Sequence, residues 1–362
     1  MRKTAGLVAS LAIIATALLG APSAQAAAGD VTAEGSSFAG AILRQCATNY
    51  SVANPTQGTV TYTNSNSGGG RDAFRLGTKD FGATDIAYTG LNGDNMPANA
   101  MYVPVTSGPI AIMYNLKDNN NAPINALKIT PEVLAKIFKG QITTWDDSDI
   151  KSLQNLGIQK RLAALTNKNI LPAYRTTGSG TSANFSKYLK DVTGNFQESS
   201  DWTVATGDPT PRGTSKSSGA LLKDYVVNNP NSISYADLKD ALTGVQIAAL
   251  RNEAGQFLAA NASQSLTFLS QQTDIGTKGN VNIDFTKQVT GGYNASLFTY
   301  AVVNTNATVK PTVGVSVKGA NIKKFLGYVL STCGPSVSKN LGYAAISGAV
   351  RTKALAIVNY IK

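Results

Sequence analysis

Three short stretches of small polar residues each open a helical pattern, and two of them directly follow an apolar or β-forming run. The clearest is residues 175–181, Arg-Thr-Thr-Gly-Ser-Gly-Thr. After it, Phe185, Tyr188 and Leu189 recur at helical spacing, so we expect a helix to begin near Ser179. This alternation of strands, small-residue loops and helices predicts an α/β fold built in layers.

The other two stretches lie in the first quarter of the chain. Ser36 and Ser37 precede an apolar stripe of helical spacing, and either serine suits the N-cap position of a helix. Residues 64–70, Asn-Ser-Asn-Ser-Gly-Gly-Gly, follow a β-forming run and precede a third helical pattern. A flexible linker is the alternative interpretation of that loop, although a helical segment follows it at once.

A helix start made of small residues is a place where anions bind. Its first backbone N–H groups have no partner within the helix, and the helix dipole makes that end partly positive. Ser179 and Thr181 add hydroxyl donors, and Arg175 adds the planar fork of its guanidinium group. The stretch therefore predicts a pocket for a tetrahedral oxyanion, with a Gly/Ser turn and a surface arginine as the alternative.

The first 26 residues have the pattern of a secretory signal peptide. Arg2 and Lys3 form a basic start, residues 7–19 form an apolar core, and residues 24–26 fit an A-x-A cleavage site. We expect cleavage after Ala26 and a secreted or periplasmic protein. No cysteine lies at the cleavage point and no later run of about 20 apolar residues follows, so we expect neither a lipoprotein nor a transmembrane protein.

Composition narrows the chemistry further. The chain contains no histidine, which removes Ser-His-Asp and Cys-His catalysis and most zinc sites. It also lacks the P-loop and H-E-x-x-H motifs, so we expect no enzyme activity, no cofactor and no metal site.

The chain is basic as well. Its net charge of +11 becomes +9 once Arg2 and Lys3 are removed, because no acidic residue leaves with them. A basic secreted protein can associate with anionic cell-wall polymers or with a membrane surface, and a generally basic surface is the plain alternative. No dense basic run is interleaved with aromatic residues, so we expect no binding of nucleic acid.

The two cysteines, Cys46 and Cys333, lie far apart in the sequence, and each belongs to an apolar stripe of helical spacing. In an oxidising compartment they could form a disulfide. Two free buried thiols are the alternative.

Five motifs occur in a fixed order between residues 35 and 181. They are Gly-Ser-Ser-Phe at 35–38, Ser-Gly-Gly-Gly at 67–70, Asp-Phe-Gly-Ala-Thr-Asp at 80–85, Ile-Phe-Lys-Gly-Gln-Ile-Thr-Thr-Trp-Asp-Asp at 137–147, and Arg175 with Gly-Ser-Gly-Thr at 178–181. Together they resemble the PstS family, the phosphate-binding receptors of bacterial high-affinity phosphate ABC importers.

The resemblance implies a two-domain Venus-flytrap fold of the periplasmic-binding-protein type, with two hinge strands and a ligand cleft between the domains. We place the hinges near 104–107 and 292–296. Domain I then comprises 27–105 and 294–362, and domain II comprises 106–293. The implied protein is a monomer that binds inorganic phosphate and delivers it to the membrane permease of an ABC importer.

Carried over by motif, the resemblance implies phosphate contacts at Ser37, Phe38 (through its backbone N–H), Ser67, Asp85, Arg175, Ser179, Gly180 and Thr181. Two positions depart from the family pattern. Ser37 stands where the family usually has threonine, which keeps the hydroxyl. Thr177 stands where the family has an aspartate that pairs with the arginine, so a receptor for another oxyanion, or a wall-associated protein with weakened binding, are the alternatives.

Asp85 has a chemical reason to be in such a site. A solvated loop acid is the usual explanation for one aspartate, but near pH 7 phosphate still carries one or two protons that an ionised Asp85 can accept. Sulfate carries none. A site built around a ligand hydrogen can reject a ligand that lacks it by roughly 10⁴-fold or more.

Overall fold

The computed structural model describes residues 29–176, 178–305 and 316–362. The predicted signal peptide and Thr177 lie outside the described residues, so what was expected of them stays a prediction. Helices and strands alternate along the described chain, which confirms the expected α/β class.

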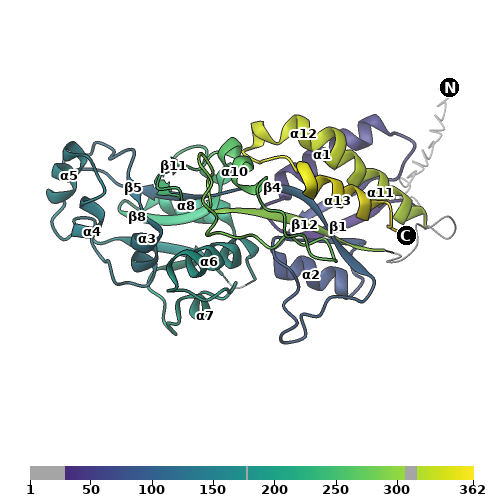
Figure 1. Ribbon diagram of the computed structural model, residues 1–362, viewed down its shortest axis with the longest axis horizontal. Coiled ribbons are helices and arrows are strands. Elements are labelled where there is room, and N and C mark those ends of the chain that lie inside the picture. Colours follow the sequence, from purple (N-terminus) through teal and green to yellow (C-terminus); the bar gives the residue numbers. More distant parts are fainter. Residues whose placement is uncertain (1–28, 177, 306–315) are drawn as a thin grey trace, which may run out of the picture.

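Four strands in the order β2-β1-β3-β12 form the first half of the molecule. β1 (Val31–Gly35) runs parallel to β2 (Val60–Asn64) and to β3 (Phe81–Thr84), whereas β12 (Ser296–Asn304) is antiparallel to β3. In Figure 1, α1, α11, α12 and α13 lie above these strands and α2 lies below them. The helical elements of this half are α1 (Gly40–Ala53), α2 (Ser67–Arg75), α11 (Val317–Tyr328), the π-helical turn Val329–Cys333, α12 (Gly334–Val337), the 3-10 turn Lys339–Leu341 and α13 (Gly348–Val358).

The second half extends the same sheet in the order β4-β8-β6-β7. β6 (Leu171–Arg175) is parallel to β8 (Ser232–Asp237) and to β7 (Thr214–Lys216), and β9 (Gln246–Ile247) pairs with β4. A small separate sheet contains β5 (Lys128–Ile129), β10 (Ala249–Arg251) and β11 (Phe257–Ala259). The helices here are α3 (Pro131–Phe138), α4 (Ser148–Lys151), α5 (Leu156–Ala163), α6 (Gly180–Thr193), α7 (Trp202–Thr206), α8 (Gly219–Asn228), α9 (Leu238–Ala241) and α10 (Ala262–Leu269).

One long strand, β4 (Ala100–Asn115), joins the two halves. Residues 100–109 pair with β12 and residues 110–115 pair with β8, both antiparallel. All of its sixteen residues except the last are buried, as expected for a strand covered on both faces. The predicted hinge 104–107 lies within β4, and the hinge 292–296 lies where the chain enters β12; their role as hinges stays a prediction.

Part of the range predicted for domain II packs against the first half. The backbone N–H of Tyr102 in β4 donates to the carbonyl of Lys278 at 2.8 Å, and that of Val281 donates to the Tyr300 hydroxyl of β12 at 3.1 Å. The predicted boundary at 293 is untested, and we propose that the stretch around 278–281 belongs with the first half.

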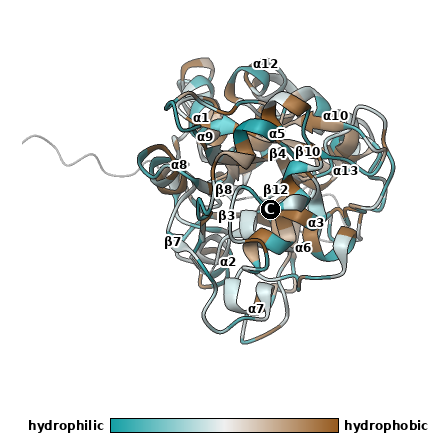
Figure 2. Cartoon of the chain, turned by 90° about the vertical axis from the view of Figure 1, so that its left-hand side faces the viewer, coloured by the Kyte–Doolittle hydropathy of each residue, from teal (hydrophilic) through white to brown (hydrophobic). Residues whose placement is uncertain are grey.

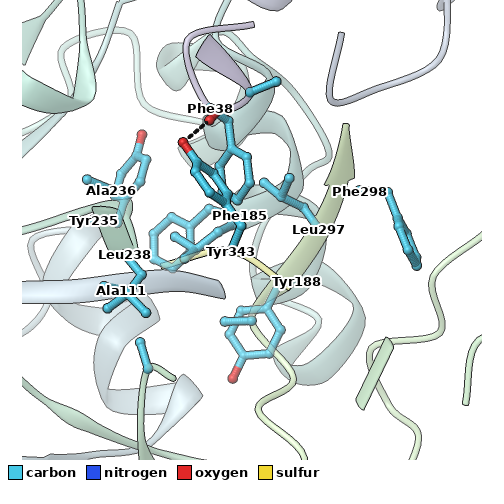
Figure 3. Packing of buried hydrophobic residues seen from close by; sticks show 14 of the residues in the cluster. Phe38, Ala111, Phe185, Tyr188, Tyr235, Ala236, Leu238, Leu297, Phe298 and Tyr343 are labelled. Atoms are coloured by element: carbon cyan, nitrogen blue, oxygen red, sulfur yellow. Dashed lines mark hydrogen bonds between the residues drawn. The ribbon is translucent and has the colours of Figure 1, made fainter. Parts of the chain in front are cut away.

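Aromatic rings fill much of the hydrophobic core. Phe185 of α6 and Tyr235 of β8 have ring centroids 4.4 Å apart, and Phe38 meets Tyr343 edge to face at 5.5 Å (Figure 3). Each buried ring of this kind removes enough apolar surface from water to stabilise the fold by about 2–3 kcal/mol. The surrounding helices carry hydrophobic and hydrophilic stretches in turn, as amphipathic layers do (Figure 2).

The two cysteines form a disulfide, which confirms the pairing and rejects the alternative of two free thiols. Cys46 lies in α1 and Cys333 ends the π-helical turn, with Cα atoms 5.7 Å apart. The bond therefore ties the beginning of the first half to its end.

Candidate functional site

A small hollow lies where the two halves meet. Its lining residues are Ser37, Asn66, Ser67, Asp85, Arg175, Ser179, Gly180 and Thr181. Seven of the eight predicted ligand residues belong to this set, and Asn66 joins them. The hollow is far smaller than the roughly 300–1,000 Å³ of pockets for organic ligands, so its size suits a small ion.

Phe38, the eighth predicted residue, does not line the hollow. Its ring is buried in the core against Tyr343, and its carbonyl accepts a hydrogen bond of 2.5 Å from the Tyr343 hydroxyl. This bond holds the backbone next to Ser37. A contact from the Phe38 backbone N–H to a ligand stays a prediction.

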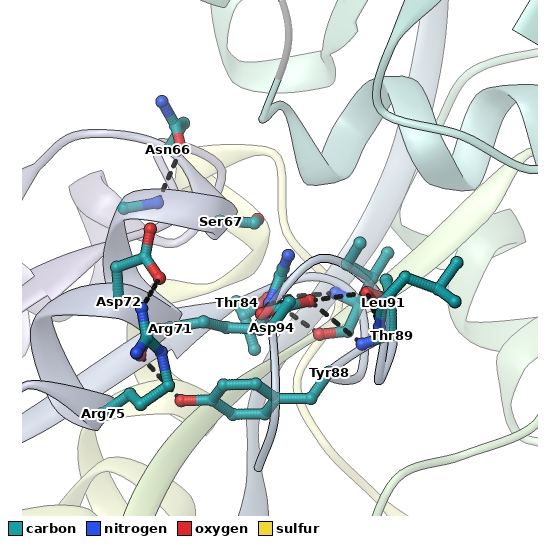
Figure 4. A network of polar contacts seen from close by, with 12 residues as sticks. Asn66, Ser67, Arg71, Asp72, Arg75, Thr84, Tyr88, Thr89, Leu91 and Asp94 are labelled. Carbon is teal, nitrogen blue, oxygen red and sulfur yellow. Dashed lines mark hydrogen bonds and ion pairs between the residues drawn. The ribbon is translucent and has the colours of Figure 1, made fainter. Parts of the chain in front are cut away.

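Two of the helix starts have the caps that their small residues suggest. Ser179 is the N-cap of α6, which confirms the expected start, and its hydroxyl accepts from the Ser182 N–H at 3.2 Å. Asn66 is the N-cap of α2 and accepts from the Gly69 N–H at 2.8 Å (Figure 4). That helix begins at Ser67, so the three glycines expected in a loop form its first turn instead.

The start of α1 differs from the prediction. The N-cap position belongs to Ala39, without a side-chain cap, so the expectation of Ser36 or Ser37 as N-cap was wrong. Helix α1 begins only at Gly40, so Ser36 lies four residues before its first residue. The Ser36 hydroxyl donates to Asp85, 49 residues away, and accepts the backbone N–H of Ala39 at 3.4 Å.

Asp85 lies at the centre of the site and is only 4% exposed, which rules out a solvated loop acid. Its Oδ1 accepts hydrogen bonds from the hydroxyls of Ser36 and Thr299, the latter at 2.6 Å. Its Oδ2 accepts from the Ser67 hydroxyl at 3.1 Å. Burial raises the pKa of Asp85, while these three hydroxyls and the charge of Arg175 act in the opposite direction.

A second polar network holds the end of β3 in place (Figure 4). The buried guanidinium of Arg71 pairs with Asp94 at 2.9 Å and donates to the Thr84 hydroxyl at 3.1 Å. Burial alone would raise the pKa of Asp94, but hydrogen bonds from Arg71 and Thr89 lower it. Because Thr84 precedes Asp85, this network positions the central carboxylate.

Arg175 ends β6 and is 3% exposed, so it is not a surface arginine. Its Nη2 donates to the carbonyl of Ser217 at 2.9 Å, and its backbone N–H donates to the Tyr235 hydroxyl at 3.2 Å. Its Nε is buried without a hydrogen-bond partner among the described residues. A buried cation with a free donor is suited to bind an anion.

The two halves touch directly at the site. The backbone N–H of Gly68 donates to the carbonyl of Gly178 at 3.1 Å, and the Asn184 side chain donates to the carbonyl of Asp85 at 2.8 Å. A Cβ at Gly180 would lie 2.1 Å from the Ser67 hydroxyl oxygen and 2.8 Å from atoms of the Asp85 side chain. Only glycine fits at the start of α6 in this arrangement.

Sequence reasoning missed several residues of the site. Asn66 directly precedes the Ser-Gly-Gly-Gly motif at 67–70, and the preference of asparagine for N-cap positions is a local signal that could have identified it. Thr299 contacts Asp85 across 214 residues, and no local pattern marks it. Asp237 lies behind Thr181, with Oδ1 3.5 Å from the Thr181 hydroxyl oxygen, and it reads in the sequence as the polar end of a strand.

Within 29–176, 178–305 and 316–362, no helix combines the length and the hydrophobicity needed to cross a bilayer. In that part of the chain, no three acidic or cysteine side chains gather as a metal site.

The chain is similar to known phosphate-binding proteins. The family model described as "PBP superfamily domain" matches residues 20–332. The phosphate-binding protein PstS of Xylella fastidiosa is 30% identical over 237 residues, which cover 64% of this chain and 60% of that protein. The PstS of Methanocaldococcus jannaschii is 26% identical over 320 residues, which cover 84% of this chain and 79% of that protein. The match therefore spans about 60% of the length of the first of these relatives.

Solved structures share the architecture. A high-affinity periplasmic phosphate-binding protein, PfluDING, aligns with a TM-score of 0.68 at 16% identity and covers 90% of this chain and 93% of its own. At that identity the likeness concerns the fold alone, and it agrees with the two-domain periplasmic-binding-protein fold expected from the sequence.

Proposed function

The chain belongs to the periplasmic-binding-protein superfamily, and we propose that it is a receptor that binds inorganic phosphate and delivers it to the permease of an ABC importer. It acts as a binding protein and not as an enzyme. Its predicted signal peptide, cleaved after Ala26, sends it outside the cytoplasm. The similarity to the PstS proteins of Xylella fastidiosa and Methanocaldococcus jannaschii supports this proposal.

The observation that carries the proposal is the combination of donors with one acceptor in the same closed hollow. Hydroxyls, the start of α6 and Arg175 supply donors and positive charge for an oxyanion. Asp85 supplies a carboxylate, which repels a fully deprotonated anion and accepts a hydrogen bond from a protonated one. Phosphate satisfies both requirements near neutral pH.

Equilibrium dialysis with radiolabelled phosphate tests the proposal on the phosphate-stripped chain 27–362. In Arg175→Lys the charge stays but the guanidinium fork is lost, so we expect affinity to fall about 10- to 100-fold. Arg161→Lys is the matched control, because Arg161 lies on α5 and pairs with Asp118, outside the hollow. We expect the phosphate affinity of this variant to be unchanged. Absence of phosphate binding by the unmodified chain would contradict the proposal.

The net charge of +9 supports one further partner. We propose that the secreted chain also associates weakly with anionic cell-wall polymers, since such contacts depend on long-range electrostatics. Washing cells with high salt should release the protein, because salt screens exposed charges. A need for detergent would contradict this association.

A further inference from the structure

Asp237 is a buried carboxylate behind the ligand hollow, and the proposed binding role does not use it. It ends β8, opposite Ile110 of β4, and is 1% exposed. It occupies the N-cap position of α9, yet its side chain makes no capping hydrogen bond. The usual structural role of an aspartate at a helix start is therefore not filled here.

The contacts of Asp237 point toward the site instead. Its Oδ1 lies 3.5 Å from the hydroxyl oxygen of Thr181, which lines the hollow. Its Oδ2 is buried and has no hydrogen-bond partner among the described residues. A buried oxygen without a partner is costly for an ionised carboxylate, so the side chain has a reason to hold a proton.

We propose that Asp237 is a positioning residue that sets the direction of the Thr181 hydroxyl, and through it the protonation state of the phosphate that the site accepts; the inference rests on the proposed phosphate-binding function. A neutral Asp237 donates its O–H to Thr181 and leaves the Thr181 hydrogen for a ligand oxygen. An ionised Asp237 accepts that hydrogen, and Thr181 then presents a lone pair, which only a protonated ligand oxygen can meet.

The charges around Asp237 place this switch in the neutral range. The pKa of Asp237 is raised to about 7, chiefly by burial and also by the neighbouring carboxylates of Asp240 and Asp85. Lys239, which pairs with Asp240, and Arg175 lower it. Tyr343 also faces this region, and because burial holds its pKa well above 10 it stays neutral.

The net charge of the site changes with the same proton. With Asp237 neutral, the charges of Asp85 and Arg175 cancel, whereas ionised Asp237 adds an uncompensated negative charge. A doubly charged phosphate then loses a donor and gains a repulsion. We expect wild-type affinity to fall as pH rises through about 7, in addition to the effect of the ligand's own titration.

The test compares phosphate dissociation constants of the mature wild type and Asp237→Asn between pH 5.5 and 8.5. The amide carries no charge and can turn its NH₂ group toward Thr181, so it imitates the neutral acid at every pH. The ionisation of free phosphate affects both dissociation constants equally at each pH, so it drops out of their ratio. We expect the wild-type dissociation constant divided by that of Asp237→Asn to be near one at pH 5.5. This ratio should rise about tenfold toward pH 8.5, with the midpoint of the rise near pH 7.

Two further variants separate positioning from a structural role. Asp240→Asn leaves the contact between Asp237 and Thr181 in place but removes a charge that raises the pKa of Asp237. The pH at which phosphate affinity falls should therefore be lower in this variant than in the wild type. This variant also keeps the test available if Asp237→Asn does not fold. In a Thr181→Val background, the effect of Asp237→Asn should shrink, because the hydroxyl that transmits it is absent.

Each outcome has one meaning. A ratio that does not change with pH would overturn the inference, and an undiminished effect in the Thr181→Val background would overturn the route through the hydroxyl. Failure of the wild type to bind phosphate at any pH would overturn the proposed function instead, so the two failures are distinguishable.

Discussion

The two carboxylate oxygens of Asp85 have unequal surroundings. Oδ1 accepts from both Ser36 and Thr299, so its two lone pairs are used, whereas among the described residues Oδ2 accepts from the hydroxyl of Ser67 alone. Oδ2 also lies 2.8 Å from the position of a Cβ at Gly180, on the side of the other half. The free lone pair of Oδ2 is therefore the one we expect to accept the proton of a bound phosphate.

Asp85→Asn tests that assignment. The amide lacks the charge that repels sulfate and can turn a donor toward the ligand, so we expect phosphate to bind more weakly and sulfate more tightly. Selectivity for phosphate should fall at least about 100-fold from its roughly 10⁴-fold starting value. Competition titrations with both anions measure it, with Asp72→Asn, an exposed carboxylate on α2, as the control. Unchanged selectivity in Asp85→Asn would rule out this role.

At the residue scale, the sequence predicts those site residues that carry a local pattern. Ser67, Ser179 and Thr181 stand at helix starts, where composition and chemistry coincide. Thr299 and Asp237 lie in or at the end of buried strands, and their roles arise only when the sheet brings distant segments together. No spacing rule reports a contact across 214 residues.

At the scale of elements, the start of α6 is the part of the second half that presses into the first. Gly178 has a φ of +91°, a conformation that glycine adopts readily, and its carbonyl accepts from Gly68 at the start of α2. Gly180 leaves no room for a Cβ, which would overlap the Ser67 hydroxyl and the Asp85 side chain. The starts of α2 and α6 thus lie next to each other at the hollow, so the positive ends of two helix dipoles face the same site.

Gly180→Ala tests this close approach. The added Cβ would lie 2.1 Å from the Ser67 hydroxyl oxygen, so the halves must separate slightly and we expect phosphate affinity to fall roughly 10- to 100-fold. Gly327→Ala is the matched control, because no atom lies within 4 Å of its Cβ position in α11, and alanine there should keep affinity and slightly raise stability. Equal phosphate affinity in the two variants would contradict the proposed contact.

The helix boundaries show where sequence patterns mislead. Glycines at 68–70 favour a loop, yet the cap from Asn66 and the packing of Phe74 place them in the first turn of α2. Ser36 has the composition of an N-cap, but α1 begins four residues after it, and its hydroxyl donates to the buried carboxylate of Asp85. In both cases side-chain hydrogen bonds and packing outweigh the propensity of the residues themselves.

At the scale of the whole molecule, β4 and the entry into β12 connect two halves that each have their own helices. The family resemblance implies a division at these two places, and their role as hinges stays a prediction. It does not predict that the stretch around Lys278 and Val281 returns to the first half, because that stretch is polar and lacks periodicity. Its position depends on hydrogen bonds to Tyr102 and Tyr300, which only the folded sheet provides.

The disulfide is confined to the first half, so it should affect stability and not binding. Cys46→Ser with Cys333→Ser removes a bond that closes a loop across 287 residues, and we expect the free energy of unfolding to drop by about 2–5 kcal/mol. Thermal unfolding with and without reductant measures the change, and reduction of the wild type should give the same shift. An unchanged melting temperature would show that the bond contributes nothing to stability.

Isothermal titration calorimetry of the mature, phosphate-stripped protein measures whether the site selects phosphate. The protein is titrated near neutral pH first with phosphate and then, in a fresh sample, with sulfate. We predict tight one-to-one binding of phosphate and no heat from sulfate, because Asp85 needs a ligand proton. Binding of both anions with similar affinity, or of neither, would contradict a phosphate receptor built around Asp85.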